Sequence, residues 1–134
     1  MTGSADTRKV VLVIDDDEGV RELLVFLVNK EGFRAESAQD GEEGFQKAEK
    51  VVPDLIILDL MLPRYGGFEL LRHLQGGELK RVPIVVVTGR YTDRSTADMI
   101  KQESNVVDFL EKPVNPAVFS AALHRVLKRA PEAA

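Results

Sequence analysis

The sequence predicts an α/β protein whose parallel sheet of five strands is covered by helices on both faces. Three observations lead to this class. Short apolar runs recur along the chain, stretches with apolar residues at helical spacing separate them, and the two kinds of segment alternate from end to end. Such alternation favours a parallel sheet, because neighbouring parallel strands need a long crossover, which is usually a helix. The predicted order is five strands and five helices.

The strands are predicted from apolar runs rich in β-branched residues. Runs without alternating polar residues indicate strands buried on both faces. Three runs have this character, at residues 10–14, 55–58 and 84–87. The segments 33–37 and 106–110 include polar residues, so we expect them to lie nearer the edges of the sheet.

The helices are predicted wherever apolar residues recur at helical spacing, over residues 20–28, 41–52, 68–74, 93–104 and 116–127. Capping residues support several of these boundaries. Gly32 is a plausible stop for the first helix, Asp40 with Glu43 resembles a capping box, and Asn115 suits the start of the last helix. The segment 93–104 has the fewest apolar residues, which favours a weakly anchored helix.

Composition excludes several classes of function. The chain has 134 residues, no cysteine, two histidines and a formal net charge of −4. Disulfides, iron–sulfur clusters, thiol catalysis and cysteine or three-histidine metal sites are therefore excluded, and the acidic balance argues against direct nucleic-acid binding. No apolar run approaches the roughly 20 residues of a membrane span. We expect a cytoplasmic protein with a disordered segment at 1–8, one domain at 9–129 and a tail at 130–134.

Chemically active side chains follow four of the predicted strands, at the sheet edge where open parallel sheets form their sites. They are Asp15, Asp16, Asp59, Thr88 and Lys112. Each alone could be an ordinary loop residue, and Asp17 and Glu18 are better interpreted as the acidic first turn of a helix. Together they indicate a site, because four separate segments each supply a group compatible with a metal or a phosphate.

The residue types at this edge suit phosphoryl chemistry. Clustered carboxylates repel one another unless a cation lies among them, and oxygen ligands without sulfur or imidazole favour Mg²⁺. A carboxylate can also act as a nucleophile and form an aspartyl phosphate. An ammonium and a hydroxyl can then bind the phosphoryl oxygens.

These residues lie in motifs that resemble the receiver domain of two-component response regulators, of the chemotaxis-receiver type. The matching stretches are residues 13–16, 58–63, 87–89 and 109–113, and the resemblance covers about residues 9–128. It implies a flavodoxin-like, doubly wound sheet with strand order 2-1-3-4-5. The chain departs from the family pattern at Gly44, where Ala is usual, and at Asn105 and Val106, where Gly and Ala are usual. Asn tolerates a left-handed backbone, so we expect that the helix over 93–104 can still end at Asn105.

The resemblance implies a role for each site residue. Asp59 would accept a phosphoryl group from the phosphohistidine of a sensor histidine kinase or a histidine phosphotransfer protein. Asp15, Asp16, Asp59 and the backbone carbonyl of Met61 would hold Mg²⁺. Lys112 would pair with the phosphoryl group, and its bond to the following proline would be cis.

The resemblance also implies a switch and docking surfaces. Thr88 would turn toward the phosphoryl group, and Phe109 would follow it. The face formed by residues 93–104, 106–110 and 116–127 would then bind a downstream protein. Leu23 and Phe26 are candidate contacts for the kinase.

Two other functions remain open from the sequence. One is a non-phosphorylated interaction module on the same fold. The other is a phosphohydrolase similar to haloacid dehalogenases, but those enzymes carry a second Asp two residues after the nucleophile, where this chain has Met61. The favoured interpretation is a phosphoacceptor signalling domain and not an enzyme.

Overall fold

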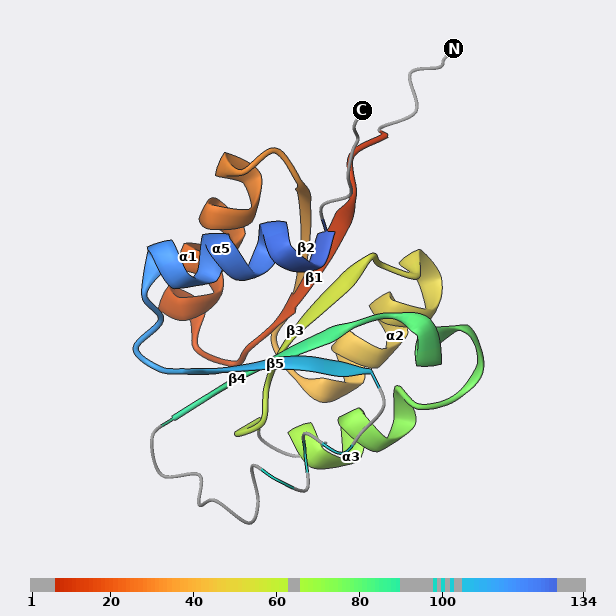
Figure 1. Ribbon diagram of the computed structural model, residues 1–134. Helices are drawn as coiled ribbons and strands as arrows, with labels where there is room; N and C mark the ends of the chain where they lie inside the picture. The colour runs from red at the N-terminus through yellow and green to blue at the C-terminus, as the bar shows by residue number, and fades with distance from the viewer. Residues whose placement is uncertain are drawn as a thin grey trace.

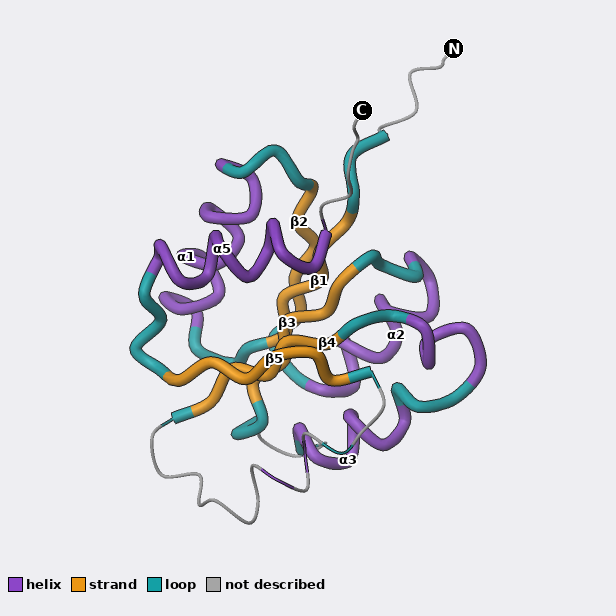
Figure 2. Tube along the Cα trace, viewed as in Figure 1, coloured by secondary structure: helices purple, strands orange, loops and turns teal. Residues whose placement is uncertain are grey.

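The computed structural model describes residues 7–62, 66–89, 98, 100, 102 and 105–127. Strands and helices alternate along them (Figures 1 and 2). The strands are β1 Val10–Ile14, β2 Arg34–Ala38, β3 Leu55–Asp59, β4 Ile84–Thr88 and β5 Val106–Glu111. The helices are α1 Glu18–Lys30, α2 Gly41–Val51, α3 Gly67–His73 and α5 Pro116–Leu127, with a short 3-10 helix, η1, at Gly77–Arg81.

The five strands form one parallel sheet in the order β2-β1-β3-β4-β5, which confirms the predicted class and strand order. The two segments with polar residues are the edge strands, also as predicted. Helices α1 and α5 cover one face of the sheet, and α2 and α3 cover the other (Figure 1). Four α-helices lie within the described ranges. Most of the helix predicted over 93–104 is outside them, as are residues 1–6 and the tail at 130–134.

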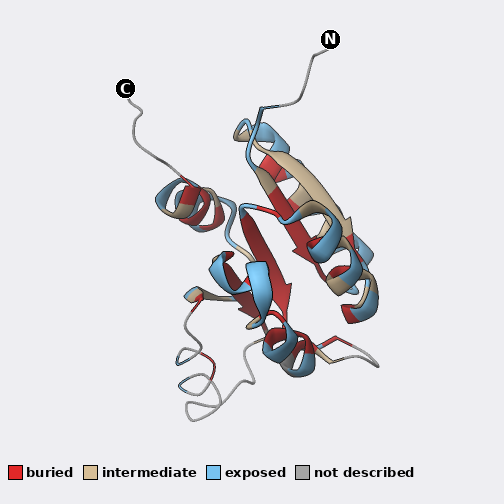
Figure 3. Ribbon diagram, turned by 90° about the vertical axis from the view of Figure 1, so that its right-hand side faces the viewer, coloured by how far each residue is buried: buried red, intermediate tan, exposed pale blue. Residues whose placement is uncertain are grey.

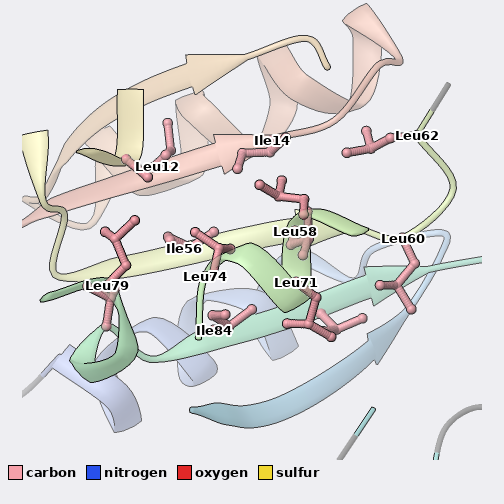
Figure 4. Close-up of a cluster of buried hydrophobic side chains, with 14 of the residues drawn as sticks. Leu12, Ile14, Ile56, Leu58, Leu60, Leu62, Leu71, Leu74, Leu79 and Ile84 are labelled. Carbon is pink, nitrogen blue, oxygen red and sulfur yellow. The ribbon is translucent and has the colours of Figure 1, made fainter. Parts of the chain in front are cut away.

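Two apolar layers hold the sheet between its helices. The three central strands are buried except at Val10, and their side chains alternate between the two faces, as the period of two in a strand requires (Figure 3). Leu12, Ile56 and Leu58 pack toward α2 and α3 (Figure 4). Val13 and Ile57 lie in the layer under α1 and α5. This burial on both faces explains why the three runs contain only apolar residues up to the carboxyl ends of their strands.

Side chains cap three helices at the predicted positions. The Oδ1 atom of Asp17 accepts the N–H of Val20 at 3.0 Å, so Asp17 is the N-cap of α1 and its helix-start interpretation is confirmed. Asp40 accepts the N–H of Glu43 at 2.9 Å. Asn115 accepts two N–H groups at the start of α5. Each bond satisfies a donor that the first helical turn leaves without a partner.

Asn105 lies directly before β5. Its side chain is buried and joins separate segments. Nδ2 donates to the carbonyl of Val82 at 3.1 Å, and Oδ1 accepts from Nε2 of Gln75 at 2.7 Å. Because a glycine has no side chain, it could not link the start of β5 to the end of α3 in this way.

Gly67 allows the start of α3 to lie directly against the backbone that follows β3. A Cβ atom at this position would lie 2.4 Å from the Cα and 2.6 Å from the carbonyl oxygen of Leu60. Backbone atoms cannot rotate out of the way as a side-chain end can. Leu60 directly follows the candidate site residue Asp59. The absence of a side chain at Gly67 therefore allows the start of α3 to pack against the backbone next to the site.

We expect Gly67→Ala to lower the free energy of unfolding by about 1–3 kcal/mol, the usual cost of overpacking. Gly66→Ala is a matched control, because nothing lies within 4 Å of its added Cβ. Its cost should stay below about 1 kcal/mol, since a weaker N-cap and a less flexible unfolded chain oppose each other. Urea unfolding of both variants measures the difference, and equal stabilities would contradict the steric argument.

Candidate functional site

Buried carboxylates from two adjacent strands face one lysine at the carboxyl edge of the sheet. The Nζ atom of Lys112 lies 2.9 Å from Oδ2 of Asp15 and 3.1 Å from Oδ2 of Asp59. Asp15 follows β1, Asp59 ends β3, and Lys112 follows β5. The fold therefore joins three of the predicted site residues, although Lys112 is far from the other two along the chain.

Asp59 is buried and both of its oxygens have contacts. Oδ1 accepts the N–H of Met61 at 2.9 Å, and Oδ2 accepts from the ammonium of Lys112. The side chain of Met61 is 67% exposed and lines the open side of the site. The carboxylate of Asp59 is therefore oriented from within the protein but borders a pocket of about 590 Å³ that also includes Asp16 and Lys112.

Asp15 is the most deeply buried charged group of this site among the described residues. Its Oδ1 accepts the N–H of Asp17 at 2.9 Å, whereas no hydrogen bond of good geometry reaches Oδ2 despite the close ammonium of Lys112. Burial raises the pKa of Asp15, and the contact with Lys112 only partly offsets it. Burial alone would lower the pKa of Lys112, but the nearby carboxylates of Asp15 and Asp59 outweigh this effect and raise it.

The donor set fits a hard divalent cation. Asp15, Asp16 and Asp59 each present a carboxylate oxygen, and these atoms lie within 4.8 Å of one another. Asp16 is exposed, so a cation could reach the group from solvent. The buried Oδ2 of Asp15 has an unused acceptor position, and all three donors are oxygens, which Mg²⁺ prefers. Such a cation would offset the repulsion between these carboxylates.

Thr88 and Phe109 lie on the same face of neighbouring strands. Val86 packs in the layer toward α2 and α3, so Thr88, two residues later in β4, points to that side too. Phe109 pairs with Val86 across β4 and β5 and packs against the same layer. Thr88 is buried, and its carbonyl accepts the N–H of Lys112 at 2.8 Å. The two predicted switch residues therefore lie on one face of adjacent strands, two register positions apart.

Two further predictions concern residues outside the acidic cluster. The bond between Lys112 and Pro113 is cis, as predicted. Leu23 and Phe26 lie on the outer side of α1 and are 38% and 61% exposed, so neither contributes fully to the core. Their position keeps them available for contact with another molecule.

Sequence reasoning missed Arg21. Its Nη1 atom donates to the main-chain carbonyl of Asp15 at 2.8 Å, inside the loop that carries the first two carboxylates. In the sequence, an arginine one turn after the acidic residues of a helix start indicates only an ordinary surface ion pair with them. Only the spacing of six residues from Asp15, in a helix that begins just after β1, could have suggested that the side chain reaches back.

No helix within the described part of the chain is long and apolar enough to cross a membrane.

Comparison with known proteins gives one consistent result. A model of the response regulator receiver domain matches residues 11–124. The alkaline phosphatase synthesis transcriptional regulatory protein PhoP of Bacillus subtilis is 35% identical over 126 residues, which cover 94% of this chain and 51% of that protein. The chain thus spans about half the length of the curated relatives it matches.

Solved structures agree with the sequence match. The chemotaxis protein CheY4 of Vibrio cholerae superposes with a TM-score of 0.82 at 30% identity, over 90% of this chain and 100% of that one. A response regulator receiver protein from Pseudomonas putida gives a TM-score of 0.80 at 30% identity, over 90% and 99% of the two chains.

Removal of Lys112 should destabilise the domain in a pH-dependent manner. Lys112→Met leaves the buried carboxylates of Asp15 and Asp59 without their cation, at a cost of about 2 kcal/mol at pH 7. This is less than the 3–5 kcal/mol of a fully buried pair, because the Lys112 side chain is 22% exposed. Asp15 has a higher pKa when folded than when unfolded. Its protonation therefore favours the folded state, and the loss should shrink as the pH falls through that raised pKa.

Urea unfolding between pH 5 and pH 8 measures this dependence. Lys50→Met, which removes an exposed lysine of α2, is the control and should show no comparable change with pH. Added Mg²⁺ should restore part of the stability of Lys112→Met. A loss that is the same at every pH would contradict the role of the buried carboxylates.

Proposed function

This chain belongs to the response regulator receiver family, and we propose that it signals by accepting a phosphoryl group on Asp59 from a phosphohistidine. The observation that carries the assignment is the ammonium of Lys112 within 3.1 Å of Asp59 and 2.9 Å of Asp15, at an edge where three carboxylates meet. Asp59 is the carboxylate placed on a central strand, bordering an open pocket.

The proposed step is a transfer between nitrogen and oxygen. A carboxylate oxygen of Asp59 forms a bond to phosphorus while the bond from phosphorus to the imidazole nitrogen breaks, and the nitrogen keeps the electron pair. The donor is a sensor histidine kinase or a histidine phosphotransfer protein. Lys112 is already beside Asp59 and can move its ammonium onto a phosphoryl oxygen with a small displacement.

Asp15, Asp16, Asp59 and the backbone carbonyl of Met61 would hold Mg²⁺. The metal would neutralise charge on the phosphoryl oxygens while the bond forms. Asp15 suits this role because its buried Oδ2 has an unused acceptor position, and Asp16 because its carboxylate is exposed to the pocket. The N–H of Met61 is already held by Asp59, which fixes the backbone that carries this carbonyl.

The readout would begin at Thr88 and Phe109, which share one face of the sheet next to the site. A phosphoryl group adds close to two negative charges, and a hydroxyl turned toward it would vacate space beside Phe109. The face formed by β5, α5 and the segment 93–104 would then change its affinity for a downstream protein. Val107 and Val118 are about half exposed on β5 and α5, which supports a contact surface there.

We place the kinase contact at Leu23 and Phe26, since exposed apolar side chains on α1 lie on the helix that starts at the acidic loop. The kinase and this domain would share the cytoplasm. PhoP is a transcriptional regulatory protein by name. For this domain we propose no direct nucleic-acid contact, because its formal net charge is −4.

The two alternative functions make different demands on the site. A phosphohydrolase of the haloacid-dehalogenase kind needs an acid or base where Met61 stands, and a thioether cannot supply one. A non-phosphorylated module would not need the contacts that hold Asp15, Asp59 and Lys112 together. We therefore propose a phosphoacceptor domain that does not turn over a substrate.

Asp59 should be the one phosphoacceptor. Incubation with acetyl phosphate and Mg²⁺ should add a single phosphoryl mass to the intact chain, and Asp59→Asn should remove it, because an amide is a poor nucleophile. Asp54→Asn, on an exposed residue that accepts the N–H of Val10, is the control and should label normally. Undiminished labelling of Asp59→Asn would refute the assignment, and turnover of small phosphate esters would favour a hydrolase.

Thr88→Ala should separate phosphorylation from its readout. Lys112 supplies charge to the transferred group, so Lys112→Ala should severely impair phosphorylation or its readout. The Thr88 hydroxyl turns toward the phosphoryl group after the transfer. Thr88→Ala should therefore still be phosphorylated, but its affinity for the downstream partner should not change on phosphorylation. A pull-down with the phosphorylated and unphosphorylated forms measures the change. A normal response of Thr88→Ala would contradict the coupling role.

A further inference from the structure

Arg21 holds the peptide group between the first two carboxylates of the site. Its Nη1 atom donates to the carbonyl of Asp15 at 2.8 Å, and the side chain is only partly exposed. That carbonyl belongs to the peptide that joins Asp15 to Asp16. A donor fixed on it therefore limits the rotation that would swing the Asp16 carboxylate away from the other two.

The first turn of α1 supports the same loop at other points. The N–H of Asp17 donates to Oδ1 of Asp15 at 2.9 Å, and Oδ1 of Asp17 accepts the N–H of Val20 at 3.0 Å. The N–H of Arg21 donates to the carbonyl of Asp17 at 2.9 Å, which places the arginine one turn above the loop. Arg21 is thus anchored by the helix at its backbone and reaches back with its side chain.

We propose that Arg21 is a positioning residue for the Mg²⁺ site, acting through the Asp15 carbonyl to keep the Asp15 and Asp16 carboxylates in a binding arrangement. The inference rests on the proposed function, because that function supplies the metal. Arg21 donates to a carbonyl and not to a carboxylate, so it orders the ligands without occupying their oxygens. Groups that orient metal ligands typically contribute 10–100-fold to metal affinity.

The charge of Arg21 acts in the opposite direction. A guanidinium near a divalent cation repels it, so removal of the charge alone would strengthen Mg²⁺ binding. Loss of positioning would therefore lower the affinity for Mg²⁺, whereas loss of the charge would raise it. This difference makes the inference testable by metal binding alone, without any measurement of phosphorylation.

The experiment is isothermal titration of the unphosphorylated chain with MgCl₂. Arg21→Met keeps an apolar stem but loses the donor and the charge, and we expect binding about 10-fold weaker than in wild type. Arg21→Lys keeps a charged donor and should recover part of this loss. Arg72→Met removes an exposed arginine of α3 and should bind as wild type does.

The outcomes distinguish the inference from the function on which it rests. Mg²⁺ binding by Arg21→Met that equals or exceeds wild type would overturn the positioning role while leaving the proposed function intact. A lysine variant that binds no better than the methionine variant would also overturn it, because a charged donor at this position would then not support Mg²⁺ binding. Wild type that binds no Mg²⁺ would overturn both. Amide NMR shifts of Asp16 and Asp17 report the loop directly and should differ between Arg21→Met and wild type without metal.

Discussion

The site depends on one lysine placed between two buried carboxylates. Asp15 and Asp59 lie at the ends of neighbouring central strands, so the sheet brings them together and removes them from water. Their repulsion must be offset by a cation, and Lys112 is the described residue that supplies it. The backbone N–H of Lys112 donates a hydrogen bond to the carbonyl of Thr88, which fixes the backbone that carries the lysine. The acidic pocket, the lysine and the end of β4 therefore form one connected unit.

Two glycines allow close packing near this edge of the sheet. Gly67 allows the start of α3 to touch the backbone of Leu60, directly after the residue proposed as phosphoacceptor. On the same side of the sheet, Gly44 lets α2 approach β1, because a Cβ there would lie 2.7 Å from Cδ1 of Ile14. Glycine lowers helix propensity by about 1 kcal/mol relative to alanine. Gly44 therefore lowers the helix propensity of α2, but it allows the helix to pack closely against Ile14, which a larger residue would disturb.

The sequence predicted the features that depend on neighbouring residues or on a repeated pattern. Continuous apolar runs marked the buried strands, caps such as Asp40 and Asn115 marked helix starts, and the rule for parallel sheets placed Asp15, Asp59 and Lys112 at one edge. The roles of Arg21, Gly67 and Asn105 could not be predicted in this way. Each depends on a contact through space, whose partner is known only when the elements are packed. The short helix η1 was missed because it carries too few residues for a periodic pattern.

The two faces of the sheet are not equivalent with respect to the site. Thr88 and Phe109 lie on the side of α2 and α3, and the layer there includes Ile100, a buried residue of the segment 93–104. Leu110, the neighbour of Phe109, packs instead in the layer under α1 and α5. A change in the position of Thr88 would therefore first affect the packing of the layer toward α2 and α3, which includes Ile100. Since close-packed interiors respond to displaced volume by shifting neighbours, Ile100 is among the described residues that such a change would displace. The proposed kinase contacts, Leu23 and Phe26, are exposed on α1, which covers the other face of the sheet. Helix α5 covers that face too. The proposed readout surface therefore includes elements from both sides of the sheet.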